Sequence, residues 1–246
     1  MHRVVVIGLI LVAVLGGRVA AQAPQATSDA VLDELRQIRQ LLEKLAGAPN
    51  RAPAPEPVRR VELPIAGHML GNPDAPLTMV EFTDLQCPFC RHFYMTAFAQ
   101  LKTAYIDTNK LRYFSRDFPI EAIHPLALTA ARAARCAGVQ GKFWEMRHAI
   151  LKNNAGLTME SLSRGAEALH LDAPRFTMCL DDGTMFRREI DQDLADAERA
   201  GLTGTPSFVI GRSTGATLKG ILIVGAQPFE AFDAQLNALL LERGID

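Results

Sequence analysis

The sequence predicts an α/β domain with a helical insertion, preceded by a short N-terminal amphipathic helix and a Pro-rich linker. Apolar segments of strand length alternate with helical segments, a long run of helices interrupts that order, and clustered prolines separate the domain from an N-terminal helix. The 246 residues, 48% hydrophobic and 22% charged, are typical of a globular protein with a substantial core. A formal net charge of -1 provides no positive field for a phosphate backbone, so nucleic acid is not an expected partner.

Residues 1–21 are predicted to be a secretory signal peptide. His2 and Arg3 form a basic start, residues 4–15 are almost entirely apolar, and small residues end the segment at Ala21. The alternative is an uncleaved membrane anchor, but the apolar run is shorter than the roughly 18 to 20 residues that span a bilayer. We therefore expect a periplasmic or otherwise extracytoplasmic protein, in a compartment where disulfides persist.

Residues 22–46 are predicted to contain an amphipathic helix with a coiled-coil-like apolar stripe. Ser28 is the expected N-cap, and Gly47 is expected to end the helix. Because a helix of this length is marginal by itself in water, the stripe needs a partner. That partner is either another copy of the chain, giving a homo-oligomer through residues 29–46, or the chain's own body. The residues of the stripe recur at alternating spacings of four and three: Val31, Leu35, Ile38, Leu42 and Leu45.

Residues 47–60 form the predicted Pro-rich linker. Four prolines stand among alanine and arginine, at Pro49, Pro53, Pro55 and Pro57. This composition favours extended polyproline geometry over a helix or a sheet interior, so the segment is expected to be a semi-rigid spacer.

The domain at residues 61–246 is predicted to alternate strands and helices around a helical insertion at about residues 124–200. Residues 77–83 and 111–115 are predicted strands, and the apolar spacing over residues 93–106 predicts a helix between them. Turn residues divide the insertion into helical pieces at residues 127–137, 143–152, 159–169, 175–180 and 185–200. Strands at 207–210 and 221–224 and a helix at 229–241 complete the domain.

Cys87-Pro88-Phe89-Cys90 is the motif that indicates chemistry. Two cysteines three positions apart, directly after a strand and at the start of a helix, can close a disulfide or open to a dithiol. The helix N-terminus favours a thiolate at Cys87, the predicted nucleophile, and Cys90 is the predicted resolving thiol. A lone C-x-x-C is also half of a zinc site, but the sequence has no second pair with zinc-ligand spacing. We therefore expect a redox pair, with no metal and no organic cofactor.

At these residues the sequence resembles the DsbA-like branch of the thioredoxin superfamily. Residues 80–93 and the distant Gly204-Thr205-Pro206 carry the resemblance, which extends from about residue 70 to the C-terminus. The resemblance implies a thioredoxin-like fold in which a cis-proline loop, with Thr205 and Pro206, lies against the cysteine pair. Thr205 is expected to pair with an extended substrate peptide, beside Pro88 and Phe89 of the motif. The alternative is an ordinary trans proline at the start of a strand.

Glu81 is a further candidate for the catalytic site. It lies six residues before Cys87 inside an apolar strand, where an acidic residue is costly unless it is exposed or used. The resemblance implies a buried acid beneath the active site that handles protons around Cys90. The alternative is a strand residue that faces solvent.

Cys136 and Cys179 are the remaining cysteines, on separate predicted helices of the insertion. In an oxidising compartment an even number of leftover thiols favours a structural disulfide, which the DsbA-like resemblance also implies. Two buried free thiols, or a second redox pair, are the alternatives.

These observations predict an exported thiol-disulfide oxidoreductase, in the first place a DsbA-like oxidase. An oligomeric disulfide isomerase or reductase is the alternative, because Phe89 can neither donate a hydrogen bond nor carry positive charge to stabilise a thiolate. A threonine before the proline also resembles isomerase and reductase relatives. A non-enzymatic peptide-binding chaperone is a further alternative. Expected partners are unfolded or partly folded exported proteins and a membrane redox protein of the DsbB or DsbD kind.

Overall fold

The structure is a computed structural model that describes residues 25–47, 59–213 and 215–242. The predicted signal peptide, residues 1–21, and most of the predicted linker lie outside the described residues. The chain divides into two compact units, residues 1–56 and residues 57–246, and each is described by itself. Within the described ranges, no helix is both long enough and apolar enough to cross a membrane.

Helix α1, Gln25–Gly47, is the described part of the first unit. It begins before Ser28, so the predicted N-cap at Ser28 is wrong and this residue lies inside the helix. Opposite charges one turn apart, Asp33 with Arg36 and Arg39 with Glu43, support the helix. Apolar side chains that are 46–59% exposed follow α1 as a stripe: Val31, Leu32, Leu35, Ile38, Leu41 and Leu42. So much apolar surface on one helix is typical of a surface for association.

A mixed sheet of six strands forms the centre of the second unit, in the order β1-β6-β5-β3-β4-β2. The strands are β1 Arg60–Pro64, β2 His68–Leu70, β3 Leu77–Thr83, β4 Leu111–Asp117, β5 Ser207–Arg212 and β6 Thr217–Val224. β3 and β4 are parallel, and the other neighbouring pairs are antiparallel. Every residue of β3 is buried, as expected for a central strand that is covered on both faces.

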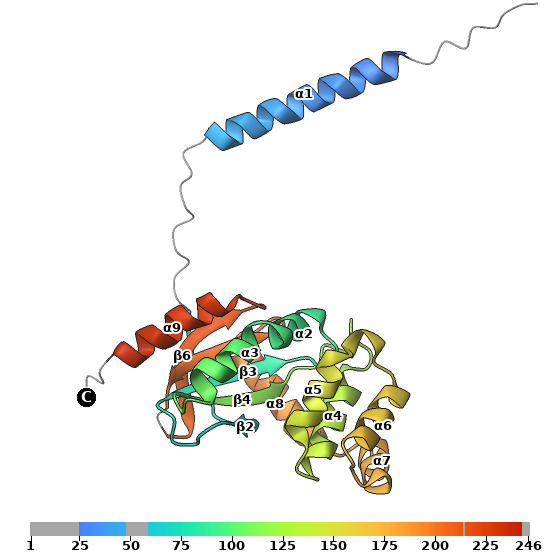
Figure 1. The fold of residues 1–246 in the computed structure, drawn as a ribbon, viewed down its shortest axis with the longest axis vertical. Coiled ribbons are helices and arrows are strands. Elements are labelled where there is room, and N and C mark those ends of the chain that lie inside the picture. The colour runs from blue at the N-terminus through green and yellow to red at the C-terminus, as the bar shows by residue number, and fades with distance from the viewer. Residues whose placement is uncertain (1–24, 48–58, 214, 243–246) are drawn as a thin grey trace, which may run out of the picture. The chain divides into compact units, whose positions relative to one another are not determined.

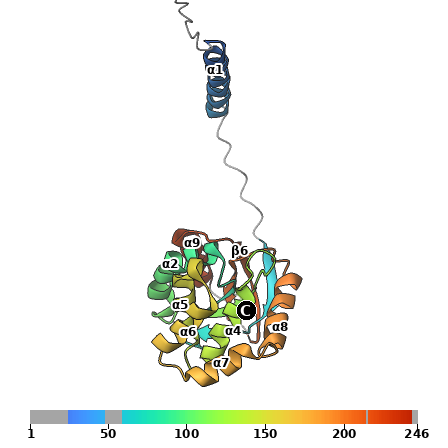
Figure 2. The ribbon, with the colours of Figure 1, turned by 90° about the vertical axis from the view of Figure 1, so that its right-hand side faces the viewer.

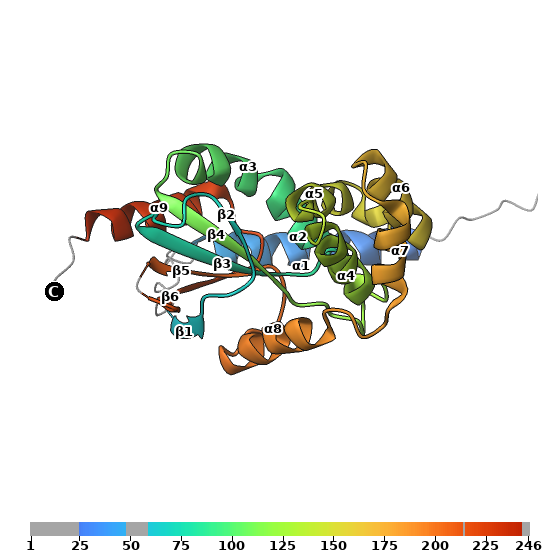
Figure 3. The ribbon, with the colours of Figure 1, turned by 90° about the horizontal axis from the view of Figure 1, so that it is seen from below.

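Helices cover both faces of this sheet (Figures 1 and 3). On one face lie α2 Pro88–Met95, α3 Ala97–Leu101 and α9 Phe229–Leu241, where Phe93 and Phe232 pack against Phe208. On the other face lies α8 Arg187–Arg199, which packs on the sheet through Ala197. Figure 2 shows α8 on the opposite side from α2 and α9. The predicted α/β class is therefore confirmed.

The helical insertion follows β4 and consists of α4 Ala127–Gly138, α5 Phe143–Lys152, α6 Met159–Ala168 and α7 Ala173–Asp181. These helices have an apolar core of their own, which includes Met146 and Phe176. Leu85, Cys87 and Cys90 belong to the same core. The insertion therefore packs against the end of β3 at which the cysteine motif lies.

The structure departs from the sequence prediction in several places. The prediction omits β1 and β2, and β1 begins at Arg60, so the predicted linker at residues 47–60 extends one residue too far. Arg59 is also bonded to the domain, donating to the carbonyl of Ala200 at 2.8 Å. The predicted helix at residues 93–106 breaks at Thr96 and ends in a π-helical segment, Lys102–Ile106. α8 falls inside the predicted insertion range but covers the sheet.

Candidate active site

The motif Cys87-Pro88-Phe89-Cys90 lies where β3 passes into α2. Cys87 is the N-cap residue of α2, and Pro88 is the first helical residue, where a missing N–H leaves no intrahelical bond unmade. The exposed fraction of Cys87 is 4%, and Cys90, one turn further into the helix, is completely buried. Both are free thiols, so the structure describes the reduced pair.

Asp84, the residue that follows β3, holds the loop before the motif. Its Oδ1 accepts hydrogen bonds from the backbone N–H groups of Gln86 at 2.8 Å and Cys87 at 3.2 Å. Its Oδ2 accepts from the N–H of Ile120 at 2.9 Å and lies 2.8 Å from Nδ1 of His124. One buried carboxylate therefore ties the cysteine loop to the segment that leads into the insertion.

Two amide side chains complete this support. Oε1 of Gln86 accepts from the N–H of Leu126 at 2.7 Å. Asn154, buried in the short turn after α5, donates from Nδ2 to the carbonyl of Cys87 at 2.9 Å. The N–H and the C=O of Cys87 are thus both bonded to side chains, which holds the backbone of the nucleophile in place.

Thr205 and Pro206 lie against Cys87, and the peptide bond between them is cis. The Cys87 thiol donates a weak hydrogen bond to the carbonyl oxygen of Thr205, with 3.6 Å between Sγ and O. Pro206 directly precedes β5, the neighbour of β3 in the sheet. The fold therefore brings two segments that are distant in the sequence together at one sulfur.

The two thiols differ in acidity. A hydrogen bond from the Cys90 thiol is the largest cause that lowers the pKa of Cys87, against the opposing effect of burial. With the smaller effects of the backbone N–H groups of Cys90 and Phe89 and of Thr205, the pKa of Cys87 is about 6. Burial raises the pKa of Cys90 well above its usual range, and the Cys87 sulfur and the Glu81 charge raise it more. At neutral pH Cys87 is therefore a thiolate and Cys90 a thiol. The side chain of Phe89 has no part in this, because its contribution comes from the backbone.

Glu81 lies on β3 in the interior and is completely buried, so it does not face solvent. Its Oε2 accepts hydrogen bonds from the hydroxyl of Tyr113 on β4 and from Nη2 of Arg147 on α5. Arg147 is completely buried as well. The carboxylate thus forms an ion pair across the boundary between the sheet and the insertion.

Exposed apolar side chains lie in the cysteine motif and in two segments that the fold brings near it. Pro88 and Phe89 are both exposed, Phe89 to 65%. Ile123, in the segment that leads into the insertion, and Val224, on β6 next to the cis-proline loop, are also exposed. Apolar side chains that remain in water beside a reactive group are typical of a binding surface.

The family model described as thioredoxin matches residues 64–221, a range that contains both motif cysteines and the cis proline. The chain belongs to the thioredoxin family.

Among solved structures, this thioredoxin domain is similar to alpha-DsbA1 of Wolbachia pipientis, with a TM-score of 0.63 and 26% identity over 72% of this chain and 92% of that chain. It is also similar to BdbD of Bacillus subtilis, with a TM-score of 0.62 and 19% identity over 72% and 96% of the chains. DsbA2 of Pseudomonas aeruginosa is similar as well, with a TM-score of 0.59 and 24% identity; the match covers 75% of this chain and 99% of that chain. The thioredoxin domain is DsbA-like.

Curated proteins that are similar to this chain in sequence are named as Na(+)/H(+) antiporters. The Na(+)/H(+) antiporter NhaA 3 of Salinispora tropica is 37% identical over 147 residues, which are 60% of this chain and 22% of that protein. The antiporter NhaA 1 of Mycolicibacterium gilvum is 36% identical over 162 residues, which are 63% of this chain and 26% of that protein. The chain spans about a quarter of the length of these relatives.

A disulfide joins Cys136 on α4 to Cys179 on α7 of the thioredoxin domain, with 5.8 Å between the Cα atoms. The bond lies in the insertion and connects two helices that pack against each other. It closes a loop of 43 residues, which places it among cross-links that stabilise a fold.

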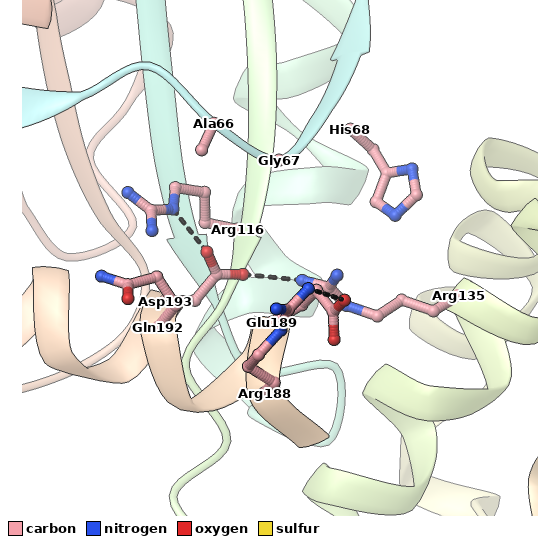
Figure 4. Close-up of a pocket in the computed structure, with 9 residues that line it drawn as sticks. All are labelled: Ala66, Gly67, His68, Arg116, Arg135, Arg188, Glu189, Gln192 and Asp193. Carbon is pink, nitrogen blue, oxygen red and sulfur yellow. Dashed lines mark hydrogen bonds and ion pairs between the residues drawn. The ribbon is translucent and has the colours of Figure 1, made fainter. Parts of the chain in front are cut away.

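A second polar centre of the thioredoxin domain lies between the sheet and α8 (Figure 4). Arg116 binds Asp193 at 2.6 Å and Asp196 at 2.5 Å, and Arg135 binds Asp117 at 2.5 Å and Asp193 at 2.7 Å. Burial and the nearby Asp117 raise the pKa of Asp193. A cavity of about 500 Å³ opens beside this cluster, and its described lining residues include neither motif cysteine. Arg199 also pairs with Asp196, so three arginines meet three carboxylates, and the cluster joins β4, α4 and α8 as a structural unit.

The residues that support the cysteine pair were not found from the sequence. Asp84 is close to the motif, and an Asp before a turn is a recognisable signal for bonding to backbone N–H groups two or three residues on. His124, Asn154 and Arg147 come from the insertion, and nothing in their sequence context marks them. Among the described residues, no three His, Cys, Asp or Glu side chains lie together as a metal site would require.

Proposed function

We propose that this protein is a thiol-disulfide oxidoreductase that introduces disulfides into exported proteins through Cys87 and Cys90. The observation that supports this most directly is the asymmetry of the pair: an acidic thiol that keeps an exposed fraction of 4% beside a cis proline, and a completely buried thiol behind it. A nucleophile and leaving group must be accessible and stable as a thiolate, whereas a resolving thiol must be shielded.

The reaction begins with the oxidised pair. A substrate thiolate attacks Sγ of Cys87, the Cys87–Cys90 bond breaks, and Cys90 leaves with the electron pair and takes up a proton. A second substrate thiolate then attacks the substrate sulfur of the mixed disulfide and releases Cys87 as a thiolate. The substrate has lost two electrons and the pair has gained them. The low pKa of Cys87 makes it a good leaving group, which favours this oxidising direction.

The substrates we propose are unfolded or partly folded exported proteins. An extended peptide would pair with the backbone at Thr205, beside the buried Pro206, and rest on the exposed side chains of Pro88 and Phe89. Continued turnover requires reoxidation of the pair, for which we propose a membrane protein of the DsbB kind. Export through residues 1–21 is tested by sequencing the N-terminus of the protein recovered outside the cytoplasm, which is expected to begin after Ala21.

The exposed stripe of α1 favours a second candidate, an oligomeric disulfide isomerase or reductase that a protein of the DsbD kind keeps reduced. In heptad terms Leu35 and Leu42 occupy one core position and Val31 and Ile38 the other, an arrangement that permits more than two strands. With parallel helices, Glu34 of one copy would lie opposite Arg39 of the next, which adds a favourable charge pair. Several active sites held on one assembly could act on one misfolded substrate together.

The oxidase proposal is tested with reduced, unfolded ribonuclease A and the Cys87→Ser/Cys90→Ser double variant, with glutathione disulfide in the buffer as the oxidant. The unaltered protein is expected to restore native disulfides, and the double variant is expected to restore none beyond the buffer control. Full activity of the double variant would overturn the enzyme proposal in favour of a peptide-binding chaperone. Activity on scrambled but not on reduced ribonuclease A would support the isomerase instead.

A further inference from the structure

Two positively charged residues lie beside Cys87 where the motif meets the helical insertion. Arg91 follows Cys87 by one turn of α2, and its backbone N–H donates to the carbonyl of Cys87 at 3.1 Å. Residues one turn apart on a helix are neighbours, so the Arg91 side chain starts next to the nucleophile. Its Nε donates to the carbonyl of Lys152, the last residue of α5, at 3.4 Å. A carbonyl oxygen carries no net charge, so this bond leaves the guanidinium charge in place.

The end of α5 is held against the nucleophile as well, and α2 and α5 lie side by side (Figures 1 and 3). Asn154, two residues after Lys152, donates from Nδ2 to the same carbonyl of Cys87 at 2.9 Å. Asn154 is buried, whereas Lys152 is exposed and Arg91 is half-buried. The carbonyl of Cys87 therefore joins α2 to the end of α5, and each element brings one cation. We call Arg91 and Lys152 the basic rim.

Among the described residues, no carboxylate forms an ion pair with either cation of the basic rim. α2 has no acidic residue, and Glu145, the one acid of α5, pairs with Lys142 at 3.0 Å. Glu160, in the first turn of α6, pairs with Arg164 at 2.5 Å. The charge of the basic rim is therefore available to a group that approaches Cys87.

The other segments around Cys87 carry little charge. Residues 202–206, which contain the cis proline, and residues 222–227, at the end of β6 and after it, include no charged residue. Residues 118–126 include one acid, Glu121, whose charge raises the pKa of Arg187 on α8. The site is thus basic on the side of α2 and α5 and uncharged on the side of the cis proline.

We propose that the basic rim favours substrates that carry a carboxylate close to the reacting cysteine, as an acidic residue beside it in an extended chain would. This inference rests on the proposed function and adds a substrate class to it. The exposed apolar side chains near Cys87 would hold the apolar part of the peptide, while Arg91 and Lys152 attract its acidic groups. The attacking substrate thiolate is itself an anion, so the same charges favour its approach to Sγ of Cys87.

The first test compares two alkylating reagents for Cys87, the anion iodoacetate and its neutral analogue iodoacetamide. A Cys90→Ser background leaves one free thiol, because Cys136 and Cys179 are bonded to each other. Both reagents react with the thiolate, so the ratio of their rate constants at one pH is independent of any change in the pKa of Cys87. The ratio of iodoacetate to iodoacetamide therefore reports the local charge alone.

The variants are Arg91→Gln, Lys152→Gln and the two combined, with Lys110→Gln as the matched control. Lys110 precedes β4, which is parallel to β3, so it lies at the end of the sheet opposite to the motif. Each change in the basic rim is expected to lower the alkylation ratio about twofold at low ionic strength, and the combination about fourfold. The control is expected to leave the ratio unchanged. In about 1 M salt all the proteins are expected to give the same ratio, because the charges are screened.

The second test uses two short peptides of otherwise equal sequence, in which a single cysteine stands between two aspartates or between two lysines. The rate constants for attack of the peptide thiolates on the oxidised protein are compared. The unaltered protein is expected to react faster with the acidic peptide, and the combined variant is expected to lower this preference about fourfold or more. Lys110→Gln is expected to retain the preference.

An unchanged alkylation ratio in Lys152→Gln and in the combined variant would overturn the proposal, and so would an equal peptide preference in the unaltered protein and the combined variant. Arg91→Gln loses a bond to the end of α5, whereas Lys152→Gln changes an exposed side chain only, so a folding failure of Arg91→Gln leaves the test intact. Alkylation involves no disulfide exchange, so the proposed function can fail in the ribonuclease assay independently of the alkylation result.

Discussion

Replacing Cys90 with alanine is expected to raise the pKa of Cys87 and slow its alkylation at neutral pH. The hydrogen bond from the Cys90 thiol is the largest cause of the low pKa of Cys87, which it helps to bring from 9.0 to about 6. At pH 7 a pKa of about 6 makes Cys87 about 90% thiolate, whereas an ordinary thiol with a pKa near 9 is about 1% thiolate. The backbone N–H groups of residues 89 and 90 remain in the variant, so we expect a rise of about one to two units rather than a full return.

The assay is the rate of iodoacetamide addition to reduced protein between pH 4 and pH 10, with the modified residue located by mass spectrometry. The unaltered protein is expected to give a midpoint near pH 6 at Cys87, and Cys90→Ala a midpoint about one to two units higher. Cys90→Ser is the matched control, because its hydroxyl keeps a donor at the same position. A midpoint near 9 in the unaltered protein, or the same midpoint in Cys90→Ala, would refute the reasoning from hydrogen bonds.

Three further changes test other parts of the structure. Replacing Cys136 and Cys179 with alanine opens a loop of 43 residues. It is expected to lower the free energy of unfolding, measured by urea denaturation, by about 4 kcal/mol. A loss below about 1 kcal/mol would show that this bond does not constrain the unfolded chain. Asp193→Ala leaves two buried arginines short of a partner and is expected to cost about 3 kcal/mol in the same assay, whereas a neutral result would contradict the structural role of the cluster. Ile38→Glu on the α1 stripe is expected to reduce the mass found by light scattering to that of a monomer. Gln40→Glu adds the same charge outside the stripe and is expected to leave the oligomer intact. A monomeric mass for the unaltered protein would exclude the association.

Local patterns in the sequence were sufficient for the elements that carry the cysteines. The buried apolar run that ends before the motif forms β3, and the periodic segments later in the chain form α5 and α9 with the bounds expected. Cys87 lies at the N-terminus of α2 because a strand, a short loop and Pro88 are consecutive there. In these places the neighbours in sequence are also the neighbours in space.

The edge strands could not be predicted for the opposite reason. β1 contains Arg60 and Glu62, and β2 has three residues, so neither has an apolar run or a period of its own. Their pairing with β6 and β4 gives them strand geometry, and that pairing depends on the folded sheet. Tertiary contacts therefore determine what local propensity leaves open.

The partners of the candidate site were hidden in the same way. Glu81 could be singled out because an acid interrupts an apolar strand, but its counter-ion comes from α5 and its second donor from β4. No spacing rule connects Arg147 or Tyr113 with the C-x-x-C motif. The expected weakening of the Cys87 thiolate by Phe89 also depended on side chains, whereas the structure stabilises this thiolate with the Cys90 thiol and backbone N–H groups.

The equilibrium reduction potential of the Cys87/Cys90 pair in glutathione buffers, measured as a function of pH, tests the central claim most directly. We predict a single two-electron transition at pH 7 between about -120 and -230 mV, the range from DsbA to the glutaredoxins. Below pH 6 reduction of the pair takes up two protons, so the reduction potential should fall by about 59 mV for each unit by which the pH rises. Above pH 6 Cys87 stays ionised and Cys90 alone takes up a proton, so the fall should be about 30 mV per pH unit. A pair that shows no transition in glutathione, or a slope of about 59 mV through pH 8, would contradict the claim that Cys87 and Cys90 form a redox pair with an acidic nucleophile.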